Sequence, residues 1–238
     1  MISIIIPAHN EEKNLKKLIP KLENCISEDL EIELLLAISP ETGDDSQRVK
    51  LPAYGRIFQC KGQGRAVQMN EAAAIAQGDI LVFLHADVFP PQEFTKDIRT
   101  SFQMGYQAGF FSYRFDSDHR LLKINAFFTA RDGIFTGGGD QCLFIKKTVF
   151  EKLGGFDEQQ VLMEDFEFFR RMKREKVRYR IVRNDLLVSA RKYEFNSYWK
   201  VNFTNLTLLF LFILGYPSCK LRSLYRRMLH LPYADTQA

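Results

Sequence analysis

The sequence predicts an α/β fold, with a mostly parallel central sheet flanked by helices. Near-continuous apolar runs at residues 2–6, 32–38 and 79–84 are typical of strands that are buried on both faces. An amphipathic helical pattern follows Asn10, which is expected to cap it, and an alanine-rich helical pattern covers 64–76. Because strands that alternate with helices form parallel sheets, this order predicts repeated βαβ units.

Beyond residue 90 the predicted order becomes mixed. After a short strand at 56–59, we expect strands at 108–115 and 141–145 and helices at 91–104, 121–130 and 164–176. Polar residues follow the first, second and fourth strands, at 7–11, 39–46 and 85–87. Ligands of open α/β sheets bind beyond the carboxyl ends of the strands, so these three segments predict the binding edge.

The chain divides into a predicted main domain, residues 1–193, and a C-terminal helical segment, residues 194–238. Six large apolar side chains of this segment recur at steps of three and four, as on one face of a helix: Phe195, Trp199, Phe203, Leu206, Phe210 and Ile213. The apolar stretch is too short to span a bilayer. Two interpretations stay open, namely a helix in a core or dimer contact, and a helix at a membrane surface flanked by bases.

The composition is that of a globular protein, with 46% hydrophobic and 26% charged residues and a net charge of +4. The charge is unevenly placed, because the residues from Arg170 onward hold 15 Lys and Arg against 4 Asp and Glu. A basic C-terminal third indicates an anionic partner, either phosphates or a membrane surface. No nucleic-acid-binding module is recognisable, and scattered cysteines without a signal-peptide pattern predict a cytoplasmic protein with free, buried thiols.

Two short motifs place carboxylates where chemistry is expected. Asp87 follows a buried strand, where a carboxylate could hold a divalent cation that bridges two phosphates, although a solvated strand end has the same pattern. Glu164 and Asp165 open a helix. They either serve as a general base and its support, or simply stabilise the helix dipole.

Two glycine-rich segments are candidates for ligand contact. Residues 137–141 (GGGDQ) allow the backbone to approach a ligand closely. Residues 61–65 (KGQGR) lead into a helix N-terminus, which attracts phosphate. A mobile loop or a tight turn explains the same glycines, and neither segment has a complete dinucleotide-binding fingerprint.

Four segments in order carry a family resemblance: SIIIPAHNEEKNL, GRAVQMNEAAAIAQGDILVFLHAD, GGGDQCLFIKKTVFEKLGGFDE and LMEDFEFFRRMKR. Over about residues 2–195 the sequence resembles the family 2 glycosyltransferases of the GT-A fold. It is most similar to a bacterial subgroup with LHAD in place of the commoner DxD, some of whose members are named arsenosugar-type glycosyltransferases. The resemblance implies a GT-A fold with a C-terminal helical appendage. It also implies inverting transfer of a hexose-like sugar from a nucleotide-diphosphate-sugar donor to a hydroxyl acceptor.

The resemblance further implies a role for each matching residue. Asp165 would be the catalytic base with Glu164 as its support, and Asp87 would be the metal ligand. The residues expected at the donor are Pro7, Ala8, Asn10, Glu11, Arg65, Asn70, His85, Ala86, Gly139, Asp140, Gln141 and Arg191. His85 stands where the first acid of a DxD would be and is expected to contact the donor rather than the metal, and Arg191 is expected on the diphosphate.

The implied cofactor is a divalent cation, Mn²⁺ or Mg²⁺, and the implied partners are a nucleotide-sugar donor and an acceptor hydroxyl on a lipid-linked or small molecule. For residues 195–230 we expect either peripheral contact with an anionic inner membrane face or a homodimer contact, and no nucleic acid. Two other functions stay open: a non-catalytic sugar-nucleotide- or glycan-binding protein, and a sugar-phosphate nucleotidyltransferase. The latter would need a glycine-rich phosphate loop directly after the first strand, which PAHNEE lacks.

One residue departs from the family's pattern. The second strand of the family usually ends in an aspartate that helps to hold the nucleoside, and Ala37 stands at that position. Loss of a charge-assisted hydrogen bond would weaken donor binding by ~1.5–3 kcal/mol. Asp44 and Asp45 are the candidate substitutes, and the sequence leaves the choice between them open.

Overall fold

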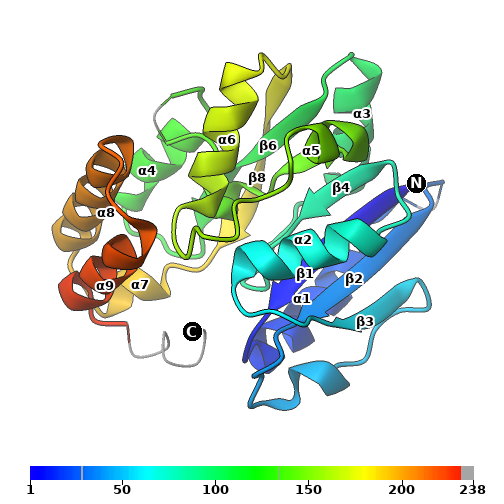
Figure 1. The fold of residues 1–238 in the computed structure, drawn as a ribbon, viewed down its shortest axis with the longest axis horizontal. Coiled ribbons are helices and arrows are strands. Elements are labelled where there is room, and N and C mark those ends of the chain that lie inside the picture. The colour runs from blue at the N-terminus through cyan, green and yellow to red at the C-terminus, as the bar shows by residue number, and fades with distance from the viewer. Residues whose placement is uncertain (28, 134, 232–238) are drawn as a thin grey trace.

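The computed structural model describes residues 1–27, 29–133 and 135–231. These residues form an eight-stranded sheet in the order β3-β2-β1-β4-β7-β6-β8-β5 (Figure 1). The strands are β1 (Ile2–Ala8), β2 (Ile32–Ile38), β3 (Gly55–Gln59), β4 (Ile80–Phe83), β5 (Val88–Phe89), β6 (Ala108–Phe115), β7 (Phe144–Lys146) and β8 (Tyr179–Val188). The helices are α1 (Glu12–Glu23), α2 (Arg65–Ile75), α3 (Phe94–Gln103), α4 (Leu122–Thr129), α5 (Lys147–Lys152), α6 (Glu164–Arg174), α7 (Arg191–Glu194), α8 (Tyr198–Ile213) and α9 (Ser218–Met228), with 3₁₀ turns η1 (Asp45–Arg48) and η2 (Gly139–Gln141).

The α/β fold with a mostly parallel sheet is confirmed, and two of the eight strands run in the opposite direction. Strands β1 to β4 pair in parallel, as expected. Strand β7 is inserted between β4 and β6 and runs antiparallel to both, and β5 runs antiparallel to β8. Because β7 is reversed, Phe144 at its start pairs with Val82 near the end of β4. The segment that enters β7 therefore lies at the same sheet edge as the segment that leaves β4.

Helices cover both faces of the sheet, and each face has its own apolar core. On one face α1 and α3 pack on alternate residues of β1, β2 and β4, with Leu18 and Phe94 fully buried. On the other face α2, α5 and α6 pack on the intervening residues, with Met69 and Phe168 fully buried. This alternation is the period-2 pattern that a strand buried on both sides requires.

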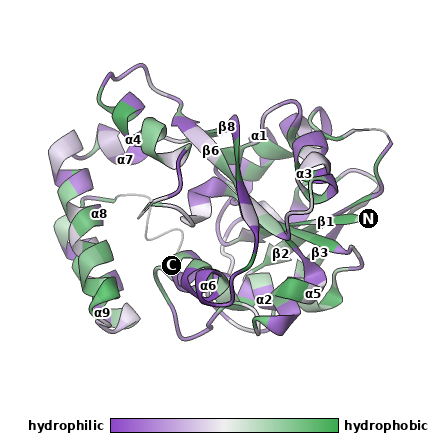
Figure 2. Cartoon of the chain, turned by 90° about the horizontal axis from the view of Figure 1, so that it is seen from above, coloured by the Kyte–Doolittle hydropathy of each residue, from purple (hydrophilic) through white to green (hydrophobic). Residues whose placement is uncertain are grey.

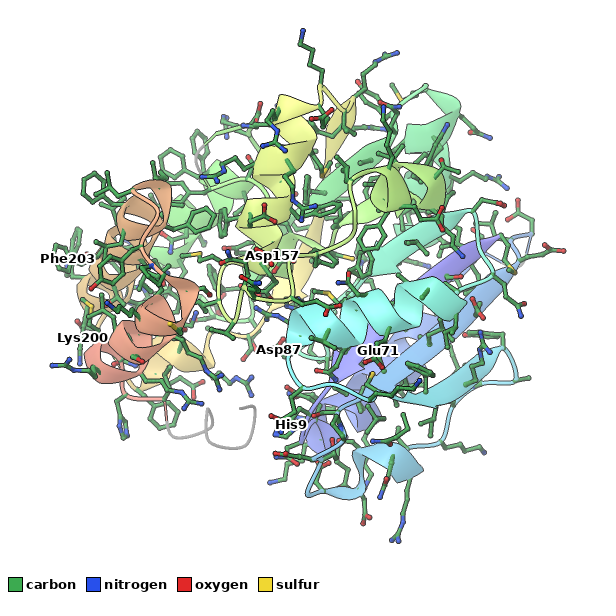
Figure 3. All side chains as sticks on the ribbon, viewed as in Figure 1. His9, Glu71, Asp87, Asp157, Lys200 and Phe203 are labelled. Atoms are coloured by element: carbon green, nitrogen blue, oxygen red, sulfur yellow. The ribbon has the colours of Figure 1, made fainter. Side chains whose placement is uncertain are left out.

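Helices α8 and α9 form a hairpin at one side of the sheet (Figure 1). The face of α8 that packs inward consists of Val201, Thr204, Leu208, Leu209 and Phe212. The predicted apolar face points away instead: Trp199 is 73% exposed and Phe203 is 66% exposed. Figure 3 shows Phe203 and Lys200 at the outer edge of α8, and Figure 2 shows α8 as a mostly hydrophobic helix at the margin of the molecule. The interpretation that this apolar face is buried in the core of the same chain is therefore wrong.

The structure corrects three other expectations. Asn10 does not cap α1: the helix begins after Glu11, and the carboxylate of Asp44 accepts a hydrogen bond from the amide of Glu12 at 2.9 Å. Strand β8 was not predicted, because Arg180, Arg183 and Asp185 interrupt its apolar pattern. A β-bulge opposite Phe111 and Tyr113 accommodates this interruption in the pairing with β6. Of the four thiols, that of Cys219 is exposed. In the part of the chain that the structure describes, every helix is too short or too polar to cross a membrane.

Candidate active site

A cavity of about 690 Å³ lies beyond the carboxyl ends of β1 and β4. Its wall includes twelve of the residues expected from the sequence: Pro7, Glu11, Arg65, His85, Ala86, Asp87, Gly139, Asp140, Gln141, Glu164, Asp165 and Arg191. Residues of α8 and α9 close its far side. In Figure 3, Asp87 lies between the sheet and this hairpin. These twelve residues come from six separate parts of the sequence, which meet around one space together with the hairpin.

Three of the expected donor-binding residues do not line the cavity. Ala8 is buried in β1, where its carbonyl accepts from Gln68. The amide oxygen of Asn10 accepts a hydrogen bond from the backbone of Gly43 at 2.7 Å. The side chain of Asn70 holds the backbone of Phe156 through two hydrogen bonds of 2.9 and 2.8 Å. All three residues build the scaffold of the site rather than its surface.

The tightest convergence in the cavity is at Gly139, in the turn η2. A Cβ atom placed on Gly139 would overlap Cε1 of His85 and Oδ2 of Asp165. These two side chains come from the end of β4 and the start of α6, so three segments approach the same backbone atom. Gln141 holds the turn in place, because its buried amide accepts from Gly137 and donates to the carbonyl of Thr129. The glycine is required here for close approach and not for an unusual backbone angle.

Arg65 and Glu164 form an ion pair beside this point. The carboxylate of Glu164 is almost fully buried, and its second oxygen, Oε2, has no hydrogen-bond partner among the described residues. Arg65 begins α2, directly after Gly64, which has a φ of 106°. The charge of Arg65 therefore compensates a carboxylate that would be costly to bury alone.

Titratable groups around the cavity have strongly shifted pKa values. Burial, together with the neighbouring carboxylate of Glu164, raises the pKa of Asp165 from 3.8 to about 8. Burial and the charge of Arg65 hold the pKa of His85 well below its usual range, so the imidazole is neutral. Enclosure in the cavity also raises the pKa of Asp140, whose carboxylate lies 3.9 Å from Nδ1 of His85. A carboxyl that titrates near neutral pH is suited to receive a proton.

Asp87, the expected metal ligand, is paired with a residue expected on the diphosphate. Its Oδ2 accepts from Nη2 of Arg191 at 3.0 Å, and both side chains are partly exposed to the cavity. Within residues 1–27, 29–133 and 135–231, no group of three or more His, Cys, Asp or Glu side chains is placed to hold a metal. Mg²⁺ is usually bound by one or two carboxylates, waters and substrate phosphates. One carboxylate at a cavity wall fits a cation of that kind, shared with a phosphate ligand, and does not form a resident metal centre.

Two residues beside the site have left-handed backbone conformations that non-glycine residues rarely adopt. Met163, which precedes α6, has a φ of 69°, and Cys142, which follows η2, has a φ of 50°. Such conformations cost about 1–3 kcal/mol each and concentrate at functional sites. These two backbone conformations direct the chain so that the first turn of α6 lies close to the turn at Gly139.

Neither candidate replaces the aspartate that is missing at Ala37. The carboxylate of Asp44 accepts from Ser46 and from the amide of Glu12. Although burial opposes it, these bonds lower the pKa of Asp44. Asp45 pairs with Arg48 at 3.2 Å on the outer surface of η1. The cavity wall nearest the end of β2 is instead formed by Ser39 and by His9, whose Nδ1 is buried without a hydrogen-bond partner in the described structure.

Several residues of the cavity wall were not named among the expected site residues: His9, Ser39, Gln63, Tyr113, Lys192, Arg222, Tyr225 and Arg226. His9, Ser39 and Gln63 belong to the segments 7–11, 39–46 and 61–65 that the sequence indicated as candidates for ligand contact. The residues of α9 carry no such signal, because a basic amphipathic helix far along the chain is usually a solvated surface. The packing of the hairpin against α6 and the segment before it brings them to the site.

The sheet, the helices on its two faces and the cavity at its edge have the arrangement of the GT-A fold. Residues 3–177 match the family described as Glycosyl transferase family 2, and the chain belongs to that family. No match was found among curated protein sequences. The expectation of the family from the four sequence segments is confirmed.

Solved structures with the same fold include glycosyltransferases bound to nucleotides. A fragment of Staphylococcus aureus TarS has a TM-score of 0.64 and 16% identity, over 88% of this chain and 65% of that one. The TarS fragment in complex with UDP-GlcNAc has a TM-score of 0.63 and 16% identity, over 95% and 71%. The mannosyltransferase PcManGT from Pyrobaculum calidifontis, in complex with GDP-Man and Mn²⁺, has a TM-score of 0.62 and 15% identity, over 87% and 62%. At these identities the likeness establishes the fold, and the chain spans just under two thirds of the first and third of these proteins.

Proposed function

We propose that this protein transfers a sugar from a nucleoside-diphosphate donor to a hydroxyl acceptor, with inversion at the anomeric carbon. One observation carries the proposal: Asp165, whose pKa is raised to about 8, converges with neutral His85 on Gly139, in a cavity that also exposes Asp87 and Arg191. Such a transfer requires a general base with a pKa near neutral pH, here Asp165, and a positively charged group for the phosphates, here Arg191. Membership of the LHAD subgroup is part of this proposal.

The proposed step forms a bond between the acceptor oxygen and the anomeric carbon, and breaks the bond between that carbon and the donor's phosphate oxygen. The proton of the acceptor hydroxyl moves to a carboxylate oxygen of Asp165. The nucleoside diphosphate leaves with the bonding electron pair, and Arg191 stabilises the charge that develops on it. Attack from the side opposite the leaving group inverts the configuration. Toward the nucleoside, His9 and Ser39 supply polar atoms where the family pattern has an aspartate.

In this proposal Asp87 would hold a divalent cation together with the phosphates of the donor. The bound cation would neutralise charge on the diphosphate. In the chain alone, Asp87 is neutralised by Arg191 at 3.0 Å. Binding of a cation to Asp87 and of phosphate to Arg191 would separate that pair, and each group would gain a new partner.

We expect Mn²⁺ to strengthen nucleotide binding only when Asp87 is present. UDP or GDP at about 100 times its dissociation constant should stabilise the protein by ~2.7 kcal/mol, which raises Tm by roughly 5–10 °C for a chain of this size. In Asp87→Asn the increment due to Mn²⁺ should disappear, whereas binding without metal should be no weaker, since the carboxylate that competes with phosphate for Arg191 is removed. Thermal unfolding with and without Mn²⁺ measures both quantities.

Asp79→Asn is the matched control, because Asp79 lies just before the other end of β4 and its side chain is 91% exposed. It should keep the full response to Mn²⁺. Absence of any nucleotide-induced shift in the wild type would instead favour a binding protein with a degraded donor pocket. Release of inorganic pyrophosphate from a nucleoside triphosphate and a sugar phosphate would favour the nucleotidyltransferase.

We further propose that the outer face of α8 docks on an anionic membrane surface. This face combines exposed Trp199, Phe203, Leu206, Phe210 and Ile213, and apolar surface of that extent is rarely left in water. Residues 195–231 hold five Lys and Arg and no Asp or Glu, so the same region is complementary to anionic lipid. The cytoplasmic, peripheral location expected from the sequence is part of this proposal.

Co-sedimentation with vesicles tests the membrane proposal. The wild type should pellet with vesicles rich in phosphatidylglycerol and remain in the supernatant with phosphatidylcholine alone. Trp199→Ser combined with Phe203→Ser should weaken binding at least tenfold, since burial of each side chain contributes ~1.5–3 kcal/mol. Ile57→Ser, which removes an exposed apolar residue from β3, should bind like the wild type. A wild type that stays in the supernatant but elutes as a dimer, dispersed by the double substitution, would identify a subunit contact instead.

A further inference from the structure

The end of the cavity nearest α6 is closed by the C-terminal hairpin. Leu208 and Leu209 of α8 and Arg222, Tyr225 and Arg226 of α9 form this part of the wall. The hydroxyl of Ser218 at the start of α9 donates to the carbonyl of Leu162 and accepts from its amide, both at 3.0 Å. Leu162 is three residues before the proposed base. The hairpin is therefore fastened to the same segment that positions Asp165.

The open end of the hairpin, where α8 begins and α9 ends, is also held by hydrogen bonds. The side chain of Asn196 donates to the carbonyl of His230 at 2.8 Å and accepts from its amide at 3.0 Å. Tyr225, between these two anchors, has the ammonium of Lys192 5.5 Å from its ring centre. Hydrogen bonds thus anchor the start of α9 to the segment before α6 and the residues after α9 to the segment before α8.

Two of those side chains are guanidiniums on one face of α9. Arg222 and Arg226 are four residues apart, so they are neighbours on the helix surface, and both line the cavity. Arg222 is half-buried, and no carboxylate among the described residues forms an ion pair with either arginine. Burial lowers the pKa of Arg222, and so does repulsion by the charge of Arg226. Like charges held together at a cavity wall indicate a place for an anion.

The donor's diphosphate already has a cationic partner elsewhere in the same cavity. Arg191, which follows β8, is paired with Asp87 at the end of β4 and would be released by phosphate and a cation. The arginines of α9 come from a different helix and line the cavity together with the apolar side chains of Leu208 and Leu209. That combination suits an anionic group attached to a carbon skeleton.

We infer that Arg222 and Arg226 form a binding site for a phosphate ester carried by the acceptor, with Leu208 and Leu209 contacting the adjacent carbon chain. The inference rests on the proposed function, because it assigns the acceptor's class to the same cavity. Two guanidiniums one turn apart can bind a tetrahedral phosphate through parallel N–H···O pairs. The phosphate can come from a soluble phosphorylated polyol or from the head group of a phospholipid, and the test separates these sources.

The test measures binding of phosphate esters to the full chain by calorimetry, without nucleotide. The probes are glycerol 3-phosphate, glycerol, and dihexanoyl phosphatidylglycerol below its micelle concentration. Wild type should bind at least one phosphate ester and not glycerol. Arg222→Gln and Arg226→Gln should each weaken binding about tenfold, and the double variant about a hundredfold. Tighter binding of glycerol 3-phosphate indicates a soluble acceptor, and tighter binding of the phospholipid indicates a lipid head group.

Arg227→Gln is the matched control, because Arg227 is a neighbouring, exposed arginine of α9 that does not line the cavity. It should bind like the wild type. The inference is overturned if wild type binds neither phosphate ester, if Arg227→Gln loses as much affinity as the double variant, or if the double variant loses affinity for UDP and GDP but not for the esters. The exposed single variant Arg226→Gln keeps the test readable should the double variant unfold. Since nucleotide binding is titrated separately, failure of the proposed function would appear as absent UDP and GDP binding, whatever the esters do.

Discussion

Replacement of Asp165 by asparagine should lower sugar transfer by about 10²–10⁴-fold, the usual contribution of a general base, while the affinity for UDP or GDP stays within about threefold of the wild type. The substitution keeps the shape of the side chain and removes only its capacity to accept a proton. Transfer measured by mass spectrometry of the acceptor, with nucleotide affinity by calorimetry, tests both parts. If the rate of sugar transfer by Asp165→Asn remains within tenfold of the wild-type rate, another residue is the general base.

The same variant should be more stable than the wild type at neutral and high pH. In the folded protein, burial and Glu164 raise the pKa of Asp165 from 3.8 to about 8. A raised pKa contributes stability that is fully present below about pH 4 and is lost as the pH rises through about 8. The asparagine side chain does not titrate, so the Tm of the variant should exceed that of the wild type by an amount that grows between about pH 4 and pH 8 and then levels off. Equal Tm curves would contradict the raised pKa.

Gly139→Ala should lower transfer by at least about 10²-fold, the effect expected when reacting groups are displaced by about 1 Å. The added methyl group would overlap both the ring of His85 and the carboxylate of Asp165. Neither neighbour can move away easily: His85 is buried, and Asp165 belongs to the first turn of α6. Steady-state transfer, with circular dichroism to verify folding, measures the effect.

Gly138→Ala provides the comparison for Gly139→Ala. A Cβ atom at Gly138 would meet only the ring of Phe166, at 3.4 Å, and Gly138 has an extended backbone that alanine adopts without strain. Transfer by Gly138→Ala should therefore remain within about threefold of the wild type. Similar losses in both variants would mean that the loop needs glycine for mobility, and not for close approach of His85 and Asp165.

The donor half of the site could be predicted from the sequence because its residues follow strands. In a parallel sheet all strands end at one edge, so His85 and Asp87 had to lie near Pro7 and Glu11 once the strands were assigned. Asp165 and the segment 137–141 were candidates from their own patterns, but only the resemblance joined Asp165 and Gly139 in one site. Nothing in their spacing places the start of α6 against η2. The reversed strand β7 brings η2 to that edge, and a strand of three residues has too little pattern to reveal its direction.

Other features depended on contacts between distant residues and could not be predicted. Asn10 has the side chain of an N-cap, yet the longer-range bond from the amide of Glu12 to Asp44 prevails. The helical period of Trp199 and Phe203 was correct, but a period does not say which face of a helix meets the core. Thr204 is buried and the aromatic face is exposed because α9 and the segment before α6 pack on the other side.

The candidate site combines residues from the sheet with residues from a separately packed helical hairpin. Of the groups assigned to the donor, His9 and Asp87 follow β1 and β4 in the parallel part of the sheet, and Arg191 follows β8. The groups assigned to the acceptor come from the hairpin of α8 and α9, whose small apolar cluster is separate from the two main cores. Substitutions in the hairpin leave the packing of β1 and β4 untouched. Relatives can therefore diversify in what they glycosylate while they retain the sugar nucleotide that they consume.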